Sequence, residues 1–278
     1  MKAVLMASAL LATALLTACG GVASNAPATN KNCTVTAPST LVTPSTLTIG
    51  SDVSYPPQEF MKENVPVGFD LDVGGALAGK MCLSHTVVNQ SFTSIIPALN
   101  ARKFDVILAA MTINDERKQT VSFVPYFNAG EALVAKKGSK LRITDLSQLC
   151  GKTVAVEDGT VEKDEVNDSV NPKCPPDKQV TLKTFPVDTE ALEQLRRGTV
   201  DLHFTDSPVA AYEVKQEPDA LMVVSPVLET APEGIAVRKD DAEMLAAIQK
   251  SFKAIEDDGT YDKLLKKWGV GSGDIRKA

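Results

Sequence analysis

Histidine is scarce in this chain, with only His85 and His203 among 278 residues. Neither histidine has a partner at a spacing typical of metal ligands, and no CxxC pair occurs. The GxSxG, HExxH, Walker and GxGxxG motifs are also missing, which argues against the commonest hydrolase, metalloprotease and nucleotide-binding classes. We therefore expect no metal and no cofactor.

Long basic runs are a second absence. The formal net charge is -6 and the sequence pI is about 5.1, and the lysines and arginines occur singly or in pairs such as Lys266-Lys267. Nucleic acid is therefore not an expected partner. A hydrophobic content of 44% with 23% charged residues is typical of a globular protein, and the length allows two domains.

The N-terminus has the features of an export signal. Residues 1–18 contain one lysine, a short apolar run and then small residues, too short for a membrane span with ordinary flanks. Leu16-Thr17-Ala18-Cys19 resembles the bacterial lipobox, in which the signal is cut before the cysteine and the cysteine is acylated. A plain secretory signal that happens to contain a cysteine is the alternative. Residues 19–33 predict a flexible, lipid-anchored tether, rich in Gly, Ala, Ser and Asn.

Five cysteines are an odd number for an exported protein. With Cys19 as the lipidation site, four remain, and an oxidising compartment makes disulfides plausible. Four cysteines allow three pairings. We favour Cys33–Cys82 with Cys150–Cys174, because each pair then stays inside one domain.

From Thr46 onward, short apolar runs alternate with helix-like apolar stripes, a pattern typical of α/β units on a parallel sheet. Ligands of such sheets bind beyond the carboxyl ends of the strands. The residues in those places are mostly small or polar and form no catalytic set: Asp52 to Tyr55, Ala109 to Arg117, Glu157 to Val161, and Thr205 with Asp206.

Arg117 stands out among these residues. Asn114 is a good N-cap, and Asp115 and Glu116 suit the positive end of a helix dipole, but a cation in the same turn faces that dipole unfavourably. Arg117 is either a solvated surface charge or a guanidinium aimed at an anion. His203 lies inside an expected strand whose alternation does not reveal its face, and a core or supporting position is favoured over a catalytic base.

Six stretches in this order resemble the bacterial extracellular solute-binding proteins of family 3, the substrate-binding lipoproteins of polar amino acid ABC transporters. They cover about residues 46–270 and read "SDVSYPPQEF", "VGFDLDV", "SIIPALNARKFDVILAAMTINDERKQTVSFVPYF", "GKTVAVEDGT", "VDLHFTDSPVAAY" and "DDGTYDKLLKKWG". The resemblance implies the two-lobe periplasmic-binding-protein fold (type II), an α/β fold. Each lobe is then a mainly parallel sheet flanked by helices, and two strands form the hinge. Lobe 1 would span 34–129 and 230–278, and lobe 2 would span 133–226.

The resemblance also implies a role for each strand-end residue. Arg117 matches the arginine that grips a ligand α-carboxylate, with help from Thr112. Ala109 and Ala110 match small positions whose backbone faces the ligand, and Thr160 and Val161 match the start of a helix whose amides bind the same carboxylate. Asp206 matches the acid for the α-ammonium. Asp52, Tyr55 and Phe92 match positions around the ligand side chain, although Phe92 also begins an apolar stripe that suits a core.

The ligand is expected to be a basic amino acid. Asp52 and Glu157 would both face its side-chain end, and two acids favour a cation on which Tyr55 and Phe92 can stack. Glu157 departs from the family pattern, and strand alternation leaves its direction open. A neutral amide such as glutamine is the next choice.

The resemblance implies a non-enzymatic partner of an ABC permease. The protein is expected to be a monomer outside the cytoplasm, anchored to the cell membrane by lipid in the periplasm or at the outer face. The alternative is an enzyme on the same scaffold, since a cyclohexadienyl dehydratase resembles this family. Such an enzyme needs a general acid and base around a ring that carries a carboxylate, and Asp206 facing an ammonium site fits binding better.

Overall fold

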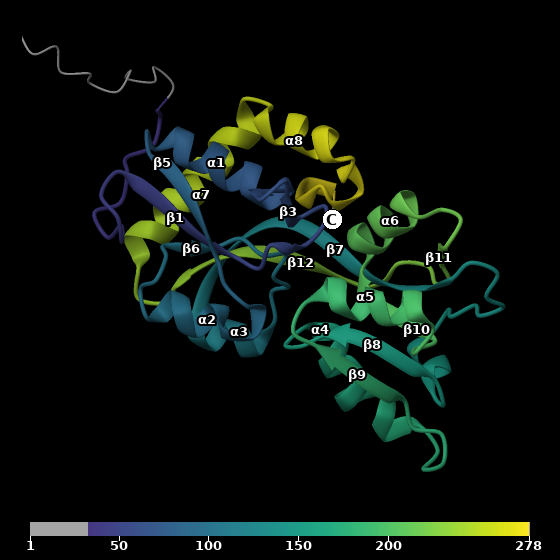
Figure 1. Cartoon of the computed structure of the whole chain (residues 1–278). Helices are drawn as coiled ribbons and strands as arrows, with labels where there is room; N and C mark the ends of the chain where they lie inside the picture. The colour runs from purple at the N-terminus through teal and green to yellow at the C-terminus, as the bar shows by residue number, and fades with distance from the viewer. Residues whose placement is uncertain (1–32, 278) are drawn as a thin grey trace, which may run out of the picture.

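One curled sheet connects the two halves of the protein (Figure 1). In the computed structural model, which describes residues 33–277, its nine strands follow the order β5-β1-β6-β12-β7-β10-β8-β9, with β11 paired to β7. Strands at each end of this order are parallel, and the central strands β12 and β7 are antiparallel to their neighbours. The fold is therefore the two-lobe α/β arrangement that the sequence predicted.

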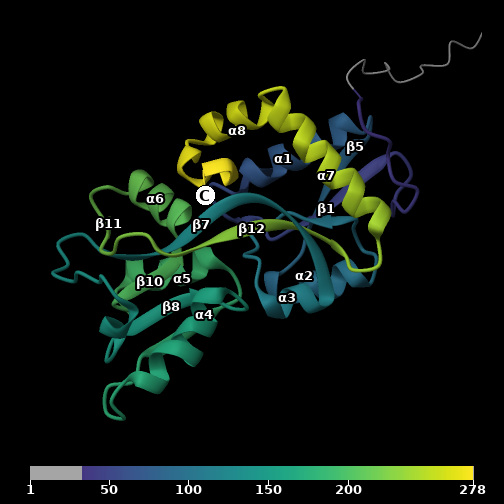
Figure 2. The same cartoon turned by 180° about the vertical axis from the view of Figure 1, so that it is seen from behind.

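Lobe 1 is built around strands β5, β1 and β6. Helices α1, α7 and α8 lie on one side of this sheet and α2 and α3 on the other (Figures 1 and 2). Its elements are β1 (Thr46–Ser51), β2 (Ser54–Tyr55), β3 (Glu59–Lys62), β4 (Val65–Val67), α1 (Phe69–Lys80), β5 (Ser84–Asn89), α2 (Phe92–Asn100), β6 (Val106–Ile107), α3 (Asp115–Thr120), α7 (Ala242–Asp257), α8 (Thr260–Trp268), η4 (Gly271–Gly273) and η5 (Ile275–Lys277).

Lobe 2 is built around the parallel strands β9, β8 and β10. Apolar side chains of α5 and α6 pack on one face of this sheet, and those of η1 and η2 pack on the other. Its elements are η1 (Leu146–Leu149), β8 (Thr153–Glu157), α4 (Val161–Asp164), η2 (Glu165–Val170), η3 (Asn171–Lys173), β9 (Thr181–Phe185), α5 (Asp188–Arg197), β10 (Leu202–Asp206), α6 (Ser207–Gln216) and β11 (Leu221–Val223).

Two long strands, β7 (Val121–Lys136) and β12 (Leu228–Arg238), run through both lobes and form the hinge. The strands pass closely beside Gly130, where an added Cβ would lie 2.4 Å from Val227 and 2.5 Å from the Leu228 carbonyl oxygen. The residue limits assigned to the lobes remain a prediction.

Each lobe has its own hydrophobic core. In lobe 1 the amphipathic helix α7 buries Met244, Ile248 and Ile255 against α1 and the sheet. In lobe 2 a core cluster that includes Leu133, Val156 and Phe204 lies on one face of the sheet. Because apolar contacts are concentrated within the lobes, the surfaces that face each other between them can carry polar groups.

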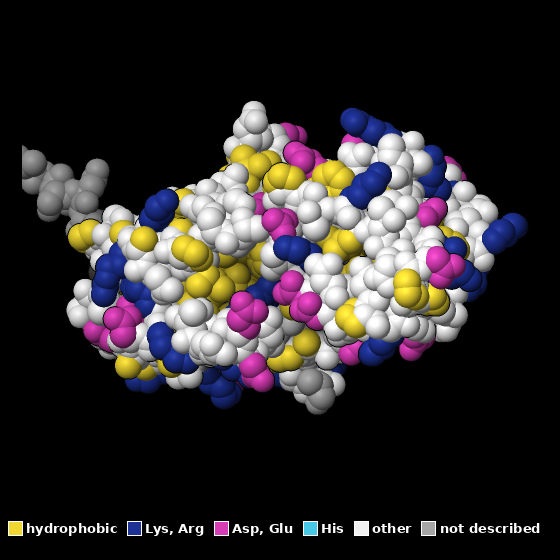
Figure 3. Space-filling view, turned by 90° about the horizontal axis from the view of Figure 1, so that it is seen from below, with side chains coloured by type: hydrophobic (Ala, Val, Ile, Leu, Met, Phe, Trp, Pro, Cys, Tyr) yellow, Lys and Arg dark blue, Asp and Glu magenta, His cyan; other side chains and the backbone are white. Residues whose placement is uncertain are grey.

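Both disulfide bonds favoured by the sequence analysis are present. Cys33–Cys82 ties the start of the described chain to the end of α1, and Cys150–Cys174 closes a loop in lobe 2. Cys19, residues 1–18 and most of the tether lie outside the described residues. No helix among residues 33–277 has the length and apolar character needed to cross a membrane. Figure 3 shows basic and acidic side chains interspersed over one face.

Replacing Cys150 and Cys174 together by alanine should lower the free energy of unfolding by about 3.5 kcal/mol, because the bond closes a loop with a sequence separation of 24. Replacing Cys33 and Cys82, with a separation of 49, should cost slightly more, about 4 kcal/mol. Urea unfolding under non-reducing conditions measures both. Unchanged stability in either pair would contradict the loop-closure argument for that bond.

Candidate ligand-binding site

Arg117 is held at the mouth of lobe 1 by its own helix start. The Asn114 side chain accepts a hydrogen bond of 2.8 Å from the Arg117 amide, so Asn114 is the N-cap of α3 as predicted. The guanidinium Nη1 donates to the Thr112 carbonyl oxygen at 2.7 Å. Its Nη2 donates to the Gly159 carbonyl oxygen of lobe 2 at 3.0 Å, so Arg117 already bridges the lobes.

A cavity lies between the lobes beside this arginine. All the ligand-binding positions predicted from sequence line it, and two further acids join them. The lining residues are Asp52, Tyr55, Glu59, Phe92, Ala109, Ala110, Thr112, Arg117, Glu157, Thr160, Val161, Glu162 and Asp206. The topology thus brings the strand ends of both lobes to one cavity.

The first part of the lobe 1 wall follows β1. The Asp52 carboxylate accepts the Phe92 amide at 2.8 Å and the Ser54 hydroxyl at 2.9 Å, which fixes it at the start of α2. Burial raises the pKa of Asp52, and these two hydrogen bonds oppose the rise. The Phe92 ring lies 5.3 Å from the Arg117 guanidinium carbon, a cation–π distance.

The second part of the lobe 1 wall is the segment after β6. Ala110 has a positive φ of 45° and donates its amide to the Asp70 carboxylate at 2.9 Å. The Tyr126 hydroxyl donates to the same carboxylate oxygen at 2.6 Å. The buried Asp70 carboxylate therefore fixes the backbone at Ala110 by a hydrogen bond. Because Ala109 and Ala110 have small side chains, their backbone lies close to the cavity.

The lobe 2 wall comes from the ends of β8 and β10. Glu157 is the last residue of β8, and the Thr160 hydroxyl donates to its carbonyl oxygen at 3.0 Å. Gly159 between them has a φ of +83°, a backbone conformation that would be strained in a residue with a side chain. Thr160 and Val161 then begin α4. Both residues line the cavity.

Asp206 ends β10 and makes the second cross-lobe contact. The Tyr55 hydroxyl of lobe 1 donates to the Asp206 carboxylate at 3.0 Å and accepts the Asp206 amide at 3.0 Å. The Asp206 side chain makes no capping bond to the backbone of α6. Its carboxylate faces the cavity.

The cavity carries more negative than positive groups. Five acids line it with one arginine, Arg117, among the described residues: Asp52, Glu59, Glu157, Glu162 and Asp206. Burial raises the pKa of each of these acids, with the neighbouring acids adding to the effect. Such a set is costly to ionise without cations, so the cavity favours ligands that carry positive charge.

Sequence reasoning missed Glu59 and Glu162. Glu59 lies in the stretch "SYPPQEF", and no sequence pattern there marks it as facing a cavity. The small sheet β2-β3-β4 places it beside Tyr55. Glu162 resembles an ordinary acid in the first turn of a helix. It is 2% exposed and lines the cavity, and the position of Thr160 at the helix start was the available signal.

Comparisons with known proteins agree with this geometry. Residues 47–271 match the family described as bacterial extracellular solute-binding proteins, family 3. The chain is 32% identical over 230 residues to the ABC transporter arginine-binding protein 1 of Escherichia coli (strain K12), covering 80% of this chain and 90% of that protein.

Two solved structures are similar as well. An ancestral arginine-binding protein bound to arginine has 40% sequence identity and a TM-score of 0.75, with 81% of this chain and 98% of that chain covered. The ancestral amino acid-binding protein AncCDT-1, a precursor of cyclohexadienyl dehydratase, has 36% identity and a TM-score of 0.73, covering 81% and 95%.

Glu162 should make stability depend on pH. Burial raises its pKa from 4.5 to about 7, so the folded state holds this proton more tightly than the unfolded state. The resulting stabilisation is fully present below about pH 4.5 and is lost as the pH rises through about 7. Glutamine at position 162 does not titrate. Between about pH 4.5 and 7 the free energy of unfolding of Glu162→Gln should therefore fall less than that of the parent protein, and the difference should be up to about 3 kcal/mol.

Urea unfolding at a series of pH values measures this difference. Glu116→Gln, which changes an exposed acid of α3, is the matched control and should follow the parent curve. Parallel curves for the parent and Glu162→Gln would contradict the assignment.

Proposed function

The chain belongs to the bacterial extracellular solute-binding proteins, family 3, and from this membership we propose that it captures a basic L-amino acid between its lobes. The captured amino acid is then handed to an ABC importer. The observation that carries the proposal is the arrangement of Arg117 and Asp206. They come from different lobes and face the same cavity, so one zwitterion can bridge them.

In the proposed complex, Arg117 binds the ligand α-carboxylate. Its guanidinium uses two donors on backbone carbonyls and keeps others for a bidentate contact. The Thr112 hydroxyl and the amides of Thr160 and Val161 surround the same anion. Asp206 accepts the α-ammonium, held in place by its bond to Tyr55. Ala109 and Ala110 contribute backbone rather than side chain.

The other end of the cavity supports a cationic side chain. Asp52 and Glu157 both line the cavity, and Glu157 has one buried carboxylate oxygen without a hydrogen-bond partner. A guanidinium or ammonium would satisfy that oxygen, and the rings of Tyr55 and Phe92 can lie along its apolar stem. The similar proteins named for arginine support this choice. Glutamine, whose amide also donates two N–H groups, is the alternative.

The ABC permease and the membrane anchor complete the proposal. We propose that the mature protein is a monomer tethered outside the cytoplasm through acylated Cys19, either in the periplasm or at the outer face of the cell membrane. Closure of the two lobes would be the signal that the permease reads, because only the closed form joins the two walls of the site. Mass spectrometry of membrane-extracted protein tests the lipid on Cys19 directly.

We propose binding rather than catalysis, although a precursor of cyclohexadienyl dehydratase shares the fold. Asp206 is engaged by Tyr55 and positioned for an ammonium, and the match to a family of solute-binding proteins supports binding. Incubation with prephenate or arogenate separates the two functions. Formation of an aromatic product by the parent protein would overturn the binding-only proposal.

Arg117→Ala should leave the fold intact and weaken amino acid binding by orders of magnitude, because the α-carboxylate of the bound amino acid would lose its charged partner. Isothermal titration calorimetry with L-arginine measures the change, and thermal unfolding verifies the fold. Arg142→Ala, at an exposed arginine of lobe 2, is the matched control and should bind like the parent. Nearly unchanged affinity of Arg117→Ala would mean that Arg117 only joins the lobes.

Ligand choice should depend on the two distal acids. The double variant Asp52→Asn with Glu157→Gln should bind L-arginine and L-lysine at least about tenfold more weakly, with a smaller effect on L-glutamine, because only the cationic side chains lose their counter-charge. Calorimetry with the twenty amino acids on the parent and the variant tests this. Asp177→Asn, at an exposed acid, serves as the control. Tight glutamate binding by the parent without arginine or lysine binding would overturn the basic-ligand proposal.

A further inference from the structure

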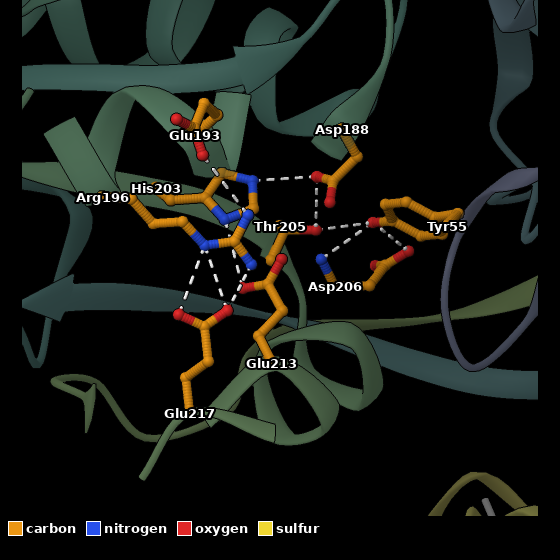
Figure 4. A network of polar contacts seen from close by, with 9 residues as sticks. All are labelled: Tyr55, Asp188, Glu193, Arg196, His203, Thr205, Asp206, Glu213 and Glu217. Carbon is orange, nitrogen blue, oxygen red and sulfur yellow. Dashed lines mark hydrogen bonds and ion pairs between the residues drawn. The ribbon is translucent and has the colours of Figure 1, made fainter. Parts of the chain in front are cut away.

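His203 lies in a buried ionic cluster directly behind the site. It is fully buried on β10, with Asp188 from the start of α5 on one side and Glu213 from α6 on the other (Figure 4). Its Nε2 lies 2.8 Å from Asp188 Oδ1, and its Nδ1 lies 3.3 Å from Glu213 Oε2. Asp188 and Glu213 are 1% and 4% exposed, so solvent cannot replace either contact.

This geometry assigns a charge to His203. A neutral imidazole has one N–H and can donate to only one carboxylate, whereas both of these ring nitrogens face carboxylate oxygens. The doubly protonated imidazolium satisfies both. Burial lowers the pKa of His203, but Asp188 and Glu213 together raise it well above its ordinary value.

The same three residues could also be considered as metal ligands. In the described contacts, however, Asp188 and Glu213 approach opposite nitrogens of the His203 ring, which is the arrangement of an imidazolium between two carboxylates. The imidazolium between two carboxylates accounts for the described contacts without an ion. The cluster is therefore a charge-balancing group rather than a metal centre.

Hydrogen bonds connect this cluster to the ligand cavity. Asp188 Oδ1, the oxygen that faces His203, also lies 3.1 Å from the Thr205 hydroxyl. Thr205 in turn lies 2.9 Å from the Tyr55 hydroxyl, and Tyr55 donates to Asp206 at 3.0 Å. Figure 4 shows this chain running from His203 in lobe 2 to Tyr55, which comes from lobe 1.

The charge of His203 affects which contacts in this series of hydrogen bonds receive a proton. Thr205 and Tyr55 have one hydroxyl proton each, but three contacts need one: Thr205 with Asp188, Thr205 with Tyr55, and Tyr55 with Asp206. Because Tyr55 donates its one proton to Asp206, Thr205 can donate its own either to Asp188 or to Tyr55. Asp188 Oδ1 already accepts a hydrogen bond from the charged N–H of His203. It is therefore a weaker acceptor for the Thr205 hydroxyl. Thr205 is then free to donate to Tyr55, and Tyr55 to Asp206.

We propose that His203 is a positioning residue for ligand capture: by pairing with Asp188 it directs the Thr205 hydroxyl to Tyr55, which holds Tyr55 and Asp206 in place across the lobes. This role rests on the proposed function of the cavity. The outer charges near the cluster, Arg196 with Glu193 and Glu217, bond mainly to one another on the surface side of Glu213 and do not reach the cavity (Figure 4).

The first measurement is the affinity for L-arginine, with L-lysine, L-histidine and L-glutamine as further probes. His203→Gln removes the charge and should weaken binding at least about tenfold in protein that is still folded. Asp241→Asn is the matched control, because it breaks the buried Arg238–Asp241 pair of lobe 1, 2.8 Å long and away from the cavity. It should lower stability but leave the affinity unchanged.

A double-mutant cycle separates positioning from general stability. Thr205→Val keeps the side-chain shape and every buried charge, so it remains usable if His203→Gln does not fold. It should weaken binding about as much as His203→Gln, and the combined variant should bind no more weakly than Thr205→Val alone. Additive losses, or unchanged affinity in Thr205→Val, would overturn the proposal.

Nuclear magnetic resonance supplies a readout that a purely structural role would not give. In a His85→Gln background only one histidine remains, and its ring nitrogens should both be protonated at neutral pH. A neutral tautomer would overturn the proposal even if binding falls. If the parent binds none of the four amino acids, the proposed function itself fails; if the parent binds and His203→Gln binds equally well, only the role of His203 fails.

Discussion

An excess of acidic over basic side chains in one cavity is the constraint on which the rest of this structure depends. Five acids share the cavity with one guanidinium among the described residues, and each buried carboxylate needs a hydrogen-bond donor or a cation to remain ionised at modest cost. Nearby groups supply part of this need: the Phe92 amide for Asp52, Tyr55 for Asp206, and His203 for Asp188. A ligand with two positive groups and one negative group would supply cations to the acids that still have none, and a carboxylate to Arg117.

The fold supplies this arrangement through the direction of its strands. Parallel strands place their carboxyl ends on one edge of each sheet, and β7 and β12 turn the two edges toward each other. Arg117 and Asp206, which lie far apart in the chain, become opposite walls of one cavity. The hydrogen bond from the Ala110 amide to Asp70 and the positive φ of Ala110 contribute to the same wall. They keep the backbone close to the space that the ligand would fill.

Much of this arrangement could be read from the sequence, and the exceptions have physical reasons. Strand-end positions such as Asp52, Thr112 and Thr160 were found because a buried strand followed by small and polar residues is a strong local pattern. Glu162 was missed because an acid in the first helical turn is usually explained by the helix dipole. His203 was recognised as a core or supporting residue, but its two acidic partners lie on separate helices, and only packing brings the three side chains together.

Closure combines contacts that the protein makes by itself with contacts that need a ligand. Arg117 reaches the Gly159 carbonyl, and Tyr55 reaches Asp206, so the closed arrangement has its own cross-lobe hydrogen bonds. A ligand shifts the balance between open and closed forms only by what it adds to the closed form. The added part is charge compensation, since the protein's own bonds leave buried oxygens of Glu157 and Glu162 without partners. Affinity in this protein should therefore depend more on where the ligand carries positive charge than on how much apolar surface it buries.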